Sequence, residues 1–133
     1  MTAISDLSTL LATMEPRLNP GVFVFATVAS LTAVDPDSVI AMVRESEGIS
    51  IVMTESDALR QSIPHDFRSA WITLNVNSAL EAVGLTAAFA RALGDVKISS
   101  NVIAGNFHDH IFVPVAQADA ALNALRSLQE ASH

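Results

Sequence analysis

The segment at residues 78–96, SALEAVGLTAAFARALGDV, is the strongest helix signal in the chain and constrains the fold most. Apolar side chains recur in it at intervals of three and four positions, so they share one face of a helix. These side chains belong to Leu85, Ala88, Phe89, Ala92 and Leu93. Ser78 and Glu81 have the spacing of a capping box, and Gly94 is placed as a C-cap. A helix with one apolar face predicts a layered fold in which that face packs on other elements.

Short apolar runs on both sides of this helix are typical of β-strands. One strand is predicted at residues 71–76, before the helix, and two more are predicted at residues 97–105 and 110–115. A closing helix carries Ala118, Ala121, Leu122, Leu125 and Leu128 on one face. The second half therefore has the order β-α-β-β-α. This order predicts a ferredoxin-like α+β fold, with an antiparallel sheet and helices packed on one face.

The first half repeats most of this order. A helix is predicted to begin after the N-cap Asp6 and to end at Pro16. Residues 21–28, GVFVFATV, are β-branched and aromatic, which favours a buried strand. Residues 29–38 are too short and turn-rich for a full crossover helix, so this half lacks the first helix of the repeat.

A hairpin and a short helix complete the first half. Strands are predicted at residues 39–44 and 48–53, with Gly48 at positive φ in the turn that joins them. Thr54 is placed as an N-cap with Asp57 three positions later, which resembles a capping box and predicts a short helix.

The best internal boundary is PHDFRSA, residues 64–70, which is predicted as a loop. The two halves are similar in the order of their elements and not in residue identity. The sequence therefore predicts two tandem lobes. Residues 1–68 contain the N-terminal helix and a truncated lobe, and residues 69–133 contain a full lobe.

Charge and composition exclude several classes of partner. The chain has seven Lys and Arg against fourteen Asp and Glu, for a formal net charge of −7. The basic residues are scattered, so no basic patch is available for nucleic acid or for an anionic membrane surface. There are no cysteines, which excludes disulfides and thiolate metal sites. The N-terminus lacks a basic n-region, and no apolar run reaches the ~18 residues that cross a bilayer. We therefore expect a cytoplasmic protein.

The stretch from residue 78 to residue 114, SALEAVGLTAAFARALGDVKISSNVIAGNFHDHIFVP, resembles the ACT-domain family. The resemblance covers residues 71–128, through the final helix. Residues 21–63 resemble the truncated first lobe of paired ACT-like proteins. The whole chain is similar to a group of small uncharacterised bacterial proteins with two tandem ACT-like lobes.

This resemblance implies a non-catalytic regulatory module that binds a small molecule, with an amino acid as the favoured ligand. The ligand would lie at an interface between lobes or subunits of a homodimer or homotetramer. Family members contact it from the loop after the first strand, the start of the first helix and the neighbouring strand. The corresponding positions here are Glu81, Val83, Gly84 and Leu85 at the helix start, Asn101, Val102 and Ile103 on the strand, and Asp109.

Three of these residues have a chemical reason to bind an amino acid. A bare backbone at Gly84 would let a carboxylate approach the helix N-terminus, where free N–H groups and the helix dipole favour an anion. Close packing of helix on sheet explains the same glycine equally well. Asp109 is suited to an ammonium group and Asn101 to an amide contact, whereas the alternative for each is a turn-forming or exposed polar residue.

The sequence His108-Asp109-His110 also raises the possibility of a metal site. In a strand, the two histidines would point to the same face. Two imidazoles are fewer than the three or four protein donors that zinc normally has. His65 and Asp66 would have to complete the set, and nothing in the sequence brings them near. We therefore expect a hairpin that edges a ligand pocket, and no metal.

Catalysis has little support in the sequence. Ser99 and Ser100, with His108 and Asp109, supply the residue types of a triad, but no strained turn exposes a serine. No glycine-rich phosphate loop is present, so we expect neither an enzyme nor a cofactor. The alternative function is a structural or oligomerisation module without a ligand, assembled through the open edges of its sheets.

Overall fold

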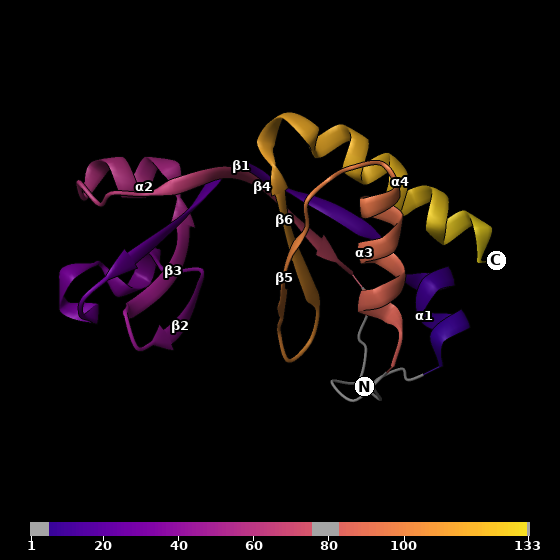
Figure 1. The fold of residues 1–133 in the computed structure, drawn as a ribbon, viewed down its shortest axis with the longest axis horizontal. Helices are drawn as coiled ribbons and strands as arrows, with labels where there is room; N and C mark the ends of the chain where they lie inside the picture. The colour runs from indigo at the N-terminus through magenta and orange to yellow at the C-terminus, as the bar shows by residue number, and fades with distance from the viewer. Residues whose placement is uncertain (1–5, 76–82, 133) are drawn as a thin grey trace. The chain divides into compact units, whose positions relative to one another are not determined.

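The computed structural model describes residues 6–75 and 83–132 (Figure 1). The helices are α1 (Leu7–Thr13), α2 (Glu55–Arg60), α3 (Leu85–Asp95) and α4 (Ala118–Ala131). The strands are β1 (Pro16–Val28), β2 (Ala41–Glu45), β3 (Gly48–Thr54), β4 (Asp66–Leu74), β5 (Asn101–Ala104) and β6 (Asp109–Pro114). The short 3₁₀ turns are η1 (Leu31–Ala33), η2 (Pro36–Ser38) and η3 (Val115–Gln117). The predicted α+β fold with an antiparallel sheet is confirmed.

The strands follow the hydrogen-bonded order β2-β3-β1-β4-β6-β5. The chain divides into two compact units. Residues 20–70 form one, which we call the hairpin unit. The described part of residues 1–19 and 71–133 forms the other, the helical unit. Strands β1 and β4 contribute residues to both units. The sequence-based division between residues 68 and 69 stays a prediction.

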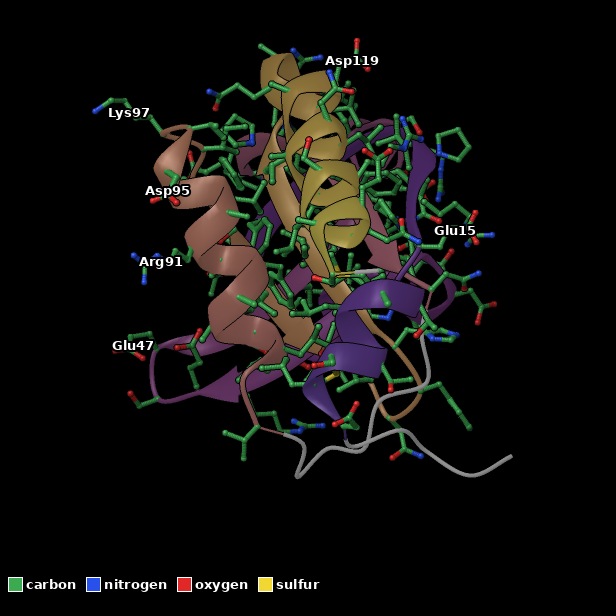
Figure 2. All side chains as sticks on the ribbon, turned by 90° about the vertical axis from the view of Figure 1, so that its right-hand side faces the viewer. Glu15, Glu47, Arg91, Asp95, Lys97 and Asp119 are labelled. Atoms are coloured by element: carbon green, nitrogen blue, oxygen red, sulfur yellow. The ribbon has the colours of Figure 1, made fainter. Side chains whose placement is uncertain are left out.

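The core of the helical unit lies between its strands and three helices. α3 packs against α4, and α1 packs against both (Figure 2). The predicted apolar stripe of α3 is confirmed, because Leu85, Phe89 and Leu93 are buried. Arg91 and Asp95 point away from the other helices (Figure 2). Ile72, Leu74, Ile111 and Val113 are fully buried strand residues that face these helices. Helices therefore cover one face of the sheet, as the order of elements predicts.

The hairpin unit has a smaller core beneath α2. Its buried residues are Val24, Ala26, Val28, Val34, Ile49, Ile51, Met53, Ala58 and Ile63. The predicted hairpin is confirmed: β2 and β3 pair antiparallel, with Glu45 opposite Gly48. Gly48 has φ +147°, and a Cβ there would lie 2.9 Å from the Thr27 side chain. The N-cap prediction is also confirmed, because Thr54 Oγ1 accepts a hydrogen bond from Asp57 N at 3.1 Å.

Two strands are longer than the sequence predicts. β1 begins at Pro16 instead of residue 21, because a proline at the first position of a strand loses no ladder hydrogen bond. β4 begins at Asp66, so the loop prediction for residues 64–70 is wrong over most of its length. The polar composition of that segment is overridden by tertiary pairing. Ser69 Oγ, for example, donates to Phe23 O at 2.8 Å.

The boundaries after α3 also differ from prediction. Gly94 is not the C-cap, since α3 continues to Asp95 and is capped at Val96. Lys97 takes the left-handed conformation instead, with φ +61°. β5 starts at Asn101, four positions later than predicted from residue 97. Ser78 and Glu81, the predicted capping box, lie outside the described residues. None of the helices that the structure describes is long and apolar enough to cross a membrane.

We predict that Thr54→Ala lowers the free energy of unfolding by about 1 kcal/mol, because the first turn of α2 loses its side-chain cap. Urea denaturation of the variant measures this loss. Ser127→Ala is the control, since Ser127 is exposed within α4 and caps nothing. Equal midpoints for the wild-type protein and Thr54→Ala would contradict the capping role.

Candidate functional site

The N-terminus of α3 is formed by a glycine in an unusual conformation. Gly84 is the N-cap, with φ +100°, so it does not lie inside the helix as predicted. Its carbonyl accepts the first helical hydrogen bond, from Ala88 N at 2.9 Å. A Cβ at this position would lie 3.0 Å from Leu7 Cδ2 of α1. Both the positive φ and the contact with α1 require glycine here.

Gly84 provides no side-chain cap, so the first turn of α3 lacks the usual acceptor. In the part of the chain that the structure describes, no side chain accepts from the N–H groups of Leu85, Thr86 or Ala87. Helix N–H groups without partners, together with the helix dipole, favour a carboxylate at this end. The two neighbours of Gly84 differ in exposure: the Val83 side chain is 83% exposed, whereas Leu85 is buried.

The hairpin of β5 and β6 divides the remaining predicted site residues between two faces. Its antiparallel register pairs Asn101 with Phe112, Val102 with Ile111, Ile103 with His110, and Ala104 with Asp109. Side chains alternate along a strand, so Val102 and Asp109 share the helix-facing side with Ile111. Asn101 and Ile103 share the opposite face with His110. Asn101 Nδ2 donates to Phe112 O at 3.4 Å.

Asp109 is a buried carboxylate at the start of β6. It is 8% exposed, and burial raises its pKa above the ordinary value, although His110 and His108 oppose this shift. Among the described residues its carboxylate has no hydrogen-bond partner, and its oxygens keep contact with solvent, because none of the fully buried side-chain oxygens described lacks a partner. The β5–β6 turn and the first turn of α3 lie at the same end of the helical unit (Figure 1). Within the described residues, this end therefore has the carboxylate of a buried aspartate and a helix N-terminus without a side-chain cap.

A polar cluster that the sequence analysis missed lies on the opposite face of the sheet. His110 Nδ1 accepts a hydrogen bond from Trp71 Nε1 at 3.0 Å and lies 3.2 Å from Thr73 Oγ1. Asn19 Nδ2 reaches Thr73 Oγ1 at 2.9 Å, and Arg17 Nη2 donates to Asn19 Oδ1 at 3.1 Å. The alternation of side chains along β4 and β6 could have revealed this cluster, because it places Trp71 and Thr73 on one face of β4 and His110 on one face of β6.

The cluster holds His110 in one protonation state. The indole N–H of Trp71 is only a donor, so Nδ1 must be an unprotonated acceptor and the ring proton lies on Nε2. Burial lowers the pKa of His110, His108 lowers it further, and Asp109 partly opposes them. Trp71 also stacks on Phe112, with ring centroids 5.9 Å apart. The imidazole is therefore part of a packed, neutral cluster.

The described residues hold no group of three or more His, Asp or Glu side chains arranged to bind a metal ion. His65, which the sequence analysis considered as a further ligand, belongs to the hairpin unit, and His108 and His110 belong to the helical unit. Glu81, the remaining predicted ligand-binding residue, lies outside the described part of the chain. The chemistry that this geometry offers is recognition of charged groups.

Comparisons with known families match both halves of the chain. Two family models, each described as an ACT domain, match residues 2–70 and residues 66–127. No match was found among curated proteins.

Solved structures are similar over nearly the whole chain. A Vibrio cholerae protein of unknown function, described as a possible transport protein, is 42% identical with a TM-score of 0.81, covering 92% of this chain and 95% of that one. An Agrobacterium tumefaciens protein is 15% identical, with a TM-score of 0.72 and coverage of 87% and 89%. The ligand-free regulatory subunit of aspartate kinase from Thermus thermophilus is 10% identical, with a TM-score of 0.70 and coverage of 88% and 97%. The last two likenesses show the fold alone.

We predict that Gly84→Ala destabilises the protein by about 1–2 kcal/mol, because alanine is strained at positive φ and its Cβ presses on Leu7. Gly94→Ala is the matched control. A Cβ at Gly94 meets nothing within 4 Å, and that variant should gain roughly 0.5–1 kcal/mol of helix propensity. Chemical denaturation of both variants measures the difference. Equal effects of the two substitutions would show that the N-cap conformation does not require glycine.

We predict an acid-dependent loss of stability that originates at His110. Its lowered pKa means that the folded state binds the proton less readily than the unfolded state. The resulting stabilisation is fully present above the ordinary value of 6.5 and is lost as the pH falls through the folded-state pKa. Melting temperatures measured across this range should fall less for His110→Asn, whose Oδ1 retains an acceptor near the position of Nδ1. Parallel curves for the two proteins would contradict this assignment.

Proposed function

Because the chain belongs to the ACT-domain family, we propose that it is a non-catalytic regulatory module that binds a small molecule, with an amino acid as its ligand. One observation carries the proposal. At one end of the helical unit, the described residues provide no side-chain cap for the N-terminus of α3 and no hydrogen-bond donor for the carboxylate of the buried residue Asp109 (Figure 1). An amino acid carries the two complementary charges, a carboxylate and an ammonium group.

The ligand carboxylate would bind the N–H groups of the first turn of α3. Gly84 places no side chain over these N–H groups, and Val83 beside it is exposed to solvent. Leu85 is buried, so its contribution is a backbone N–H group and the position of the helix. Aligned peptide dipoles at a helix N-terminus stabilise a bound anion without a basic side chain. This accounts for recognition of a carboxylate by a chain with few Lys and Arg.

The ligand ammonium would pair with Asp109. A buried carboxylate without a partner is costly, and a nearby cation removes much of that cost. Val102 shares the face of Asp109 and is suited to contact the ligand's apolar part. Asn101 and Ile103 lie on the other face of β5, an outermost strand, and would reach a ligand from an interface with a second chain.

The regulatory output would come from the interface. A ligand that contacts two lobes or two subunits favours the arrangement that buries it, and it shifts the population toward that arrangement. Glu81 belongs to the proposed site on the family resemblance alone. Assembly as a homodimer or homotetramer is part of the same proposal.

A purely structural role is the second candidate, and it rests on strand β2. β2 is outermost in the strand order and exposes two large apolar side chains, since Val43 is 58% exposed and Met42 38% exposed. An outermost strand presents unpaired backbone groups that pair readily with another chain. On this proposal the protein assembles through β2 and needs no ligand.

We predict that one amino acid or one chemical class raises the melting temperature in a thermal-shift screen of the twenty amino acids. A ligand at a hundred times its dissociation constant adds about 2.7 kcal/mol to stability. Asp109→Asn should abolish this response. Without ligand, the same variant should melt up to a few degrees higher at neutral pH, because the stabilisation that accompanies a raised carboxyl pKa is lost as the pH rises through it.

Asp95→Asn is the control for this experiment, since it makes the same change at an outward-pointing carboxylate of α3 (Figure 2). It should retain the full ligand response. A flat screen, together with a change of oligomeric state in Val43→Lys, would instead support the structural role. A ligand response that Asp109→Asn leaves intact would remove Asp109 from the site.

A further inference from the structure

The hairpin unit contains a concavity of about 390 Å³ that shares no residue with the proposed amino-acid site. Its lining comes from β1, β3 and the segment that enters β4, and comprises Phe25, Ala26, Thr27, Ser50, Pro64, His65 and Asp66. Ligand pockets of small molecules range from about 300 to 1,000 Å³, so this one suits a small metabolite. The lining combines three apolar residues with four polar ones.

The polar groups of the lining are predominantly hydrogen-bond acceptors. His65 Nδ1 lies 2.8 Å from Ile63 O, and a carbonyl oxygen only accepts, so Nδ1 bears the proton. In the neutral ring, Nε2 is then an acceptor. The Ser50 hydroxyl donates its proton to the Glu45 carboxylate, which leaves its lone pairs available. The Asp66 carboxylate is an acceptor as well. A ligand that matches these groups must supply several N–H or O–H donors.

The charge of the lining has one sign. Asp66 is its carboxylate, Glu45 is one hydrogen bond behind Ser50, and no Lys or Arg belongs to the lining. Two arginines of the same unit are already paired with carboxylates: Arg60 with Asp57 at 3.0 Å, and Arg68 with Glu55 at 2.6 Å. The lining itself therefore carries a carboxylate and no Lys or Arg, which favours a cation over an anion.

An aromatic wall adds to this preference. The Phe25 ring lines the concavity, and its centroid lies 5.7 Å from that of Phe67. The face of an aromatic ring attracts an ammonium or guanidinium group and also packs against methylene groups. Acceptors, negative charge and an aromatic face together are complementary to an organic cation.

We propose that this concavity binds a small organic cation, an ammonium or guanidinium group on a short apolar body. The cationic N–H groups donate to Asp66, His65 Nε2 and the hydroxyl oxygens of Thr27 and Ser50. The apolar body lies against Phe25 and Pro64, whereas Ala26 contributes only its backbone, because its side chain belongs to the core. A free amino acid fits poorly, because its carboxylate would face Asp66. This site is independent of the proposed amino-acid site in the helical unit.

The test is a titration of the intact protein with n-butylammonium and agmatine, in which NMR and calorimetry detect binding. The uncharged 1-butanol and the anionic butyrate are the matched comparison probes. We expect the two cations to bind at millimolar concentration and to shift the signals of residues 25–27 and 64–66. Butyrate should not bind. Asp66→Asn should weaken binding of the cations about fivefold, the size of an exposed ion pair.

Asp37→Asn is the matched control, because Asp37 is exposed in the same unit and does not line the concavity. Equal weakening by both substitutions would mean general attraction to a chain of net charge −7, and would overturn the proposal. Binding of 1-butanol as tight as that of n-butylammonium would also overturn it.

Should Asp66→Asn fail to fold, Thr27→Val and Phe25→Leu replace it as test variants. Unchanged affinity for the cations in both variants would overturn the site. The amino-acid response should survive Asp66→Asn and be lost in Asp109→Asn, so the two sites fail separately.

Discussion

The pairing of β1 with β4 is the interaction on which both units depend. β1 supplies Val24 and Ala26 to the core of the hairpin unit, and its first residues belong to the helical unit. In the helical unit, Asn75 N donates to Glu15 O at 2.8 Å just beyond the ends of the two strands, and in the hairpin unit Ser69 Oγ donates to Phe23 O at 2.8 Å. Loss of either strand would remove part of two cores.

Electrostatically, both units leave acceptors where a ligand could bind. The helical unit contains Asp109, a buried residue whose carboxylate accepts no hydrogen bond from the described residues, and the lining of the concavity in the hairpin unit contains several acceptors. His110 differs from these groups, because Trp71 and Thr73 satisfy its Nδ1. A buried acceptor with a partner stabilises the fold, whereas one without a partner costs stability until a donor arrives. On this basis, we assign a structural role to polar groups whose hydrogen bonds are made within the protein, and a ligand-binding role to acceptors that have no donor.

Local features of the fold were predicted well from the sequence. Asp6 and Thr54 cap α1 and α2 as expected, because a cap joins residues only three positions apart. The predictions failed where distant pairing decides the structure, as at residues 64–70, which are polar but lie mostly in β4. The sequence marks Gly84 as a special position, but the contact with Leu7 that leaves little room for a Cβ comes from far away in the sequence.

The order of the elements, the apolar faces of the helices and the scarcity of basic residues follow from the sequence alone, because periodicity and composition are local properties. The face of the β5–β6 hairpin that each polar residue occupies depends on how the strands pair in the folded protein. Val102 and Asp109 face the helices and Asn101 and Ile103 face away, since strand register is set by pairing across the sheet. The protonation state of His110 was likewise decided by Trp71, 39 positions earlier in the chain. A hydrogen bond over such a distance leaves no periodic signal in the sequence.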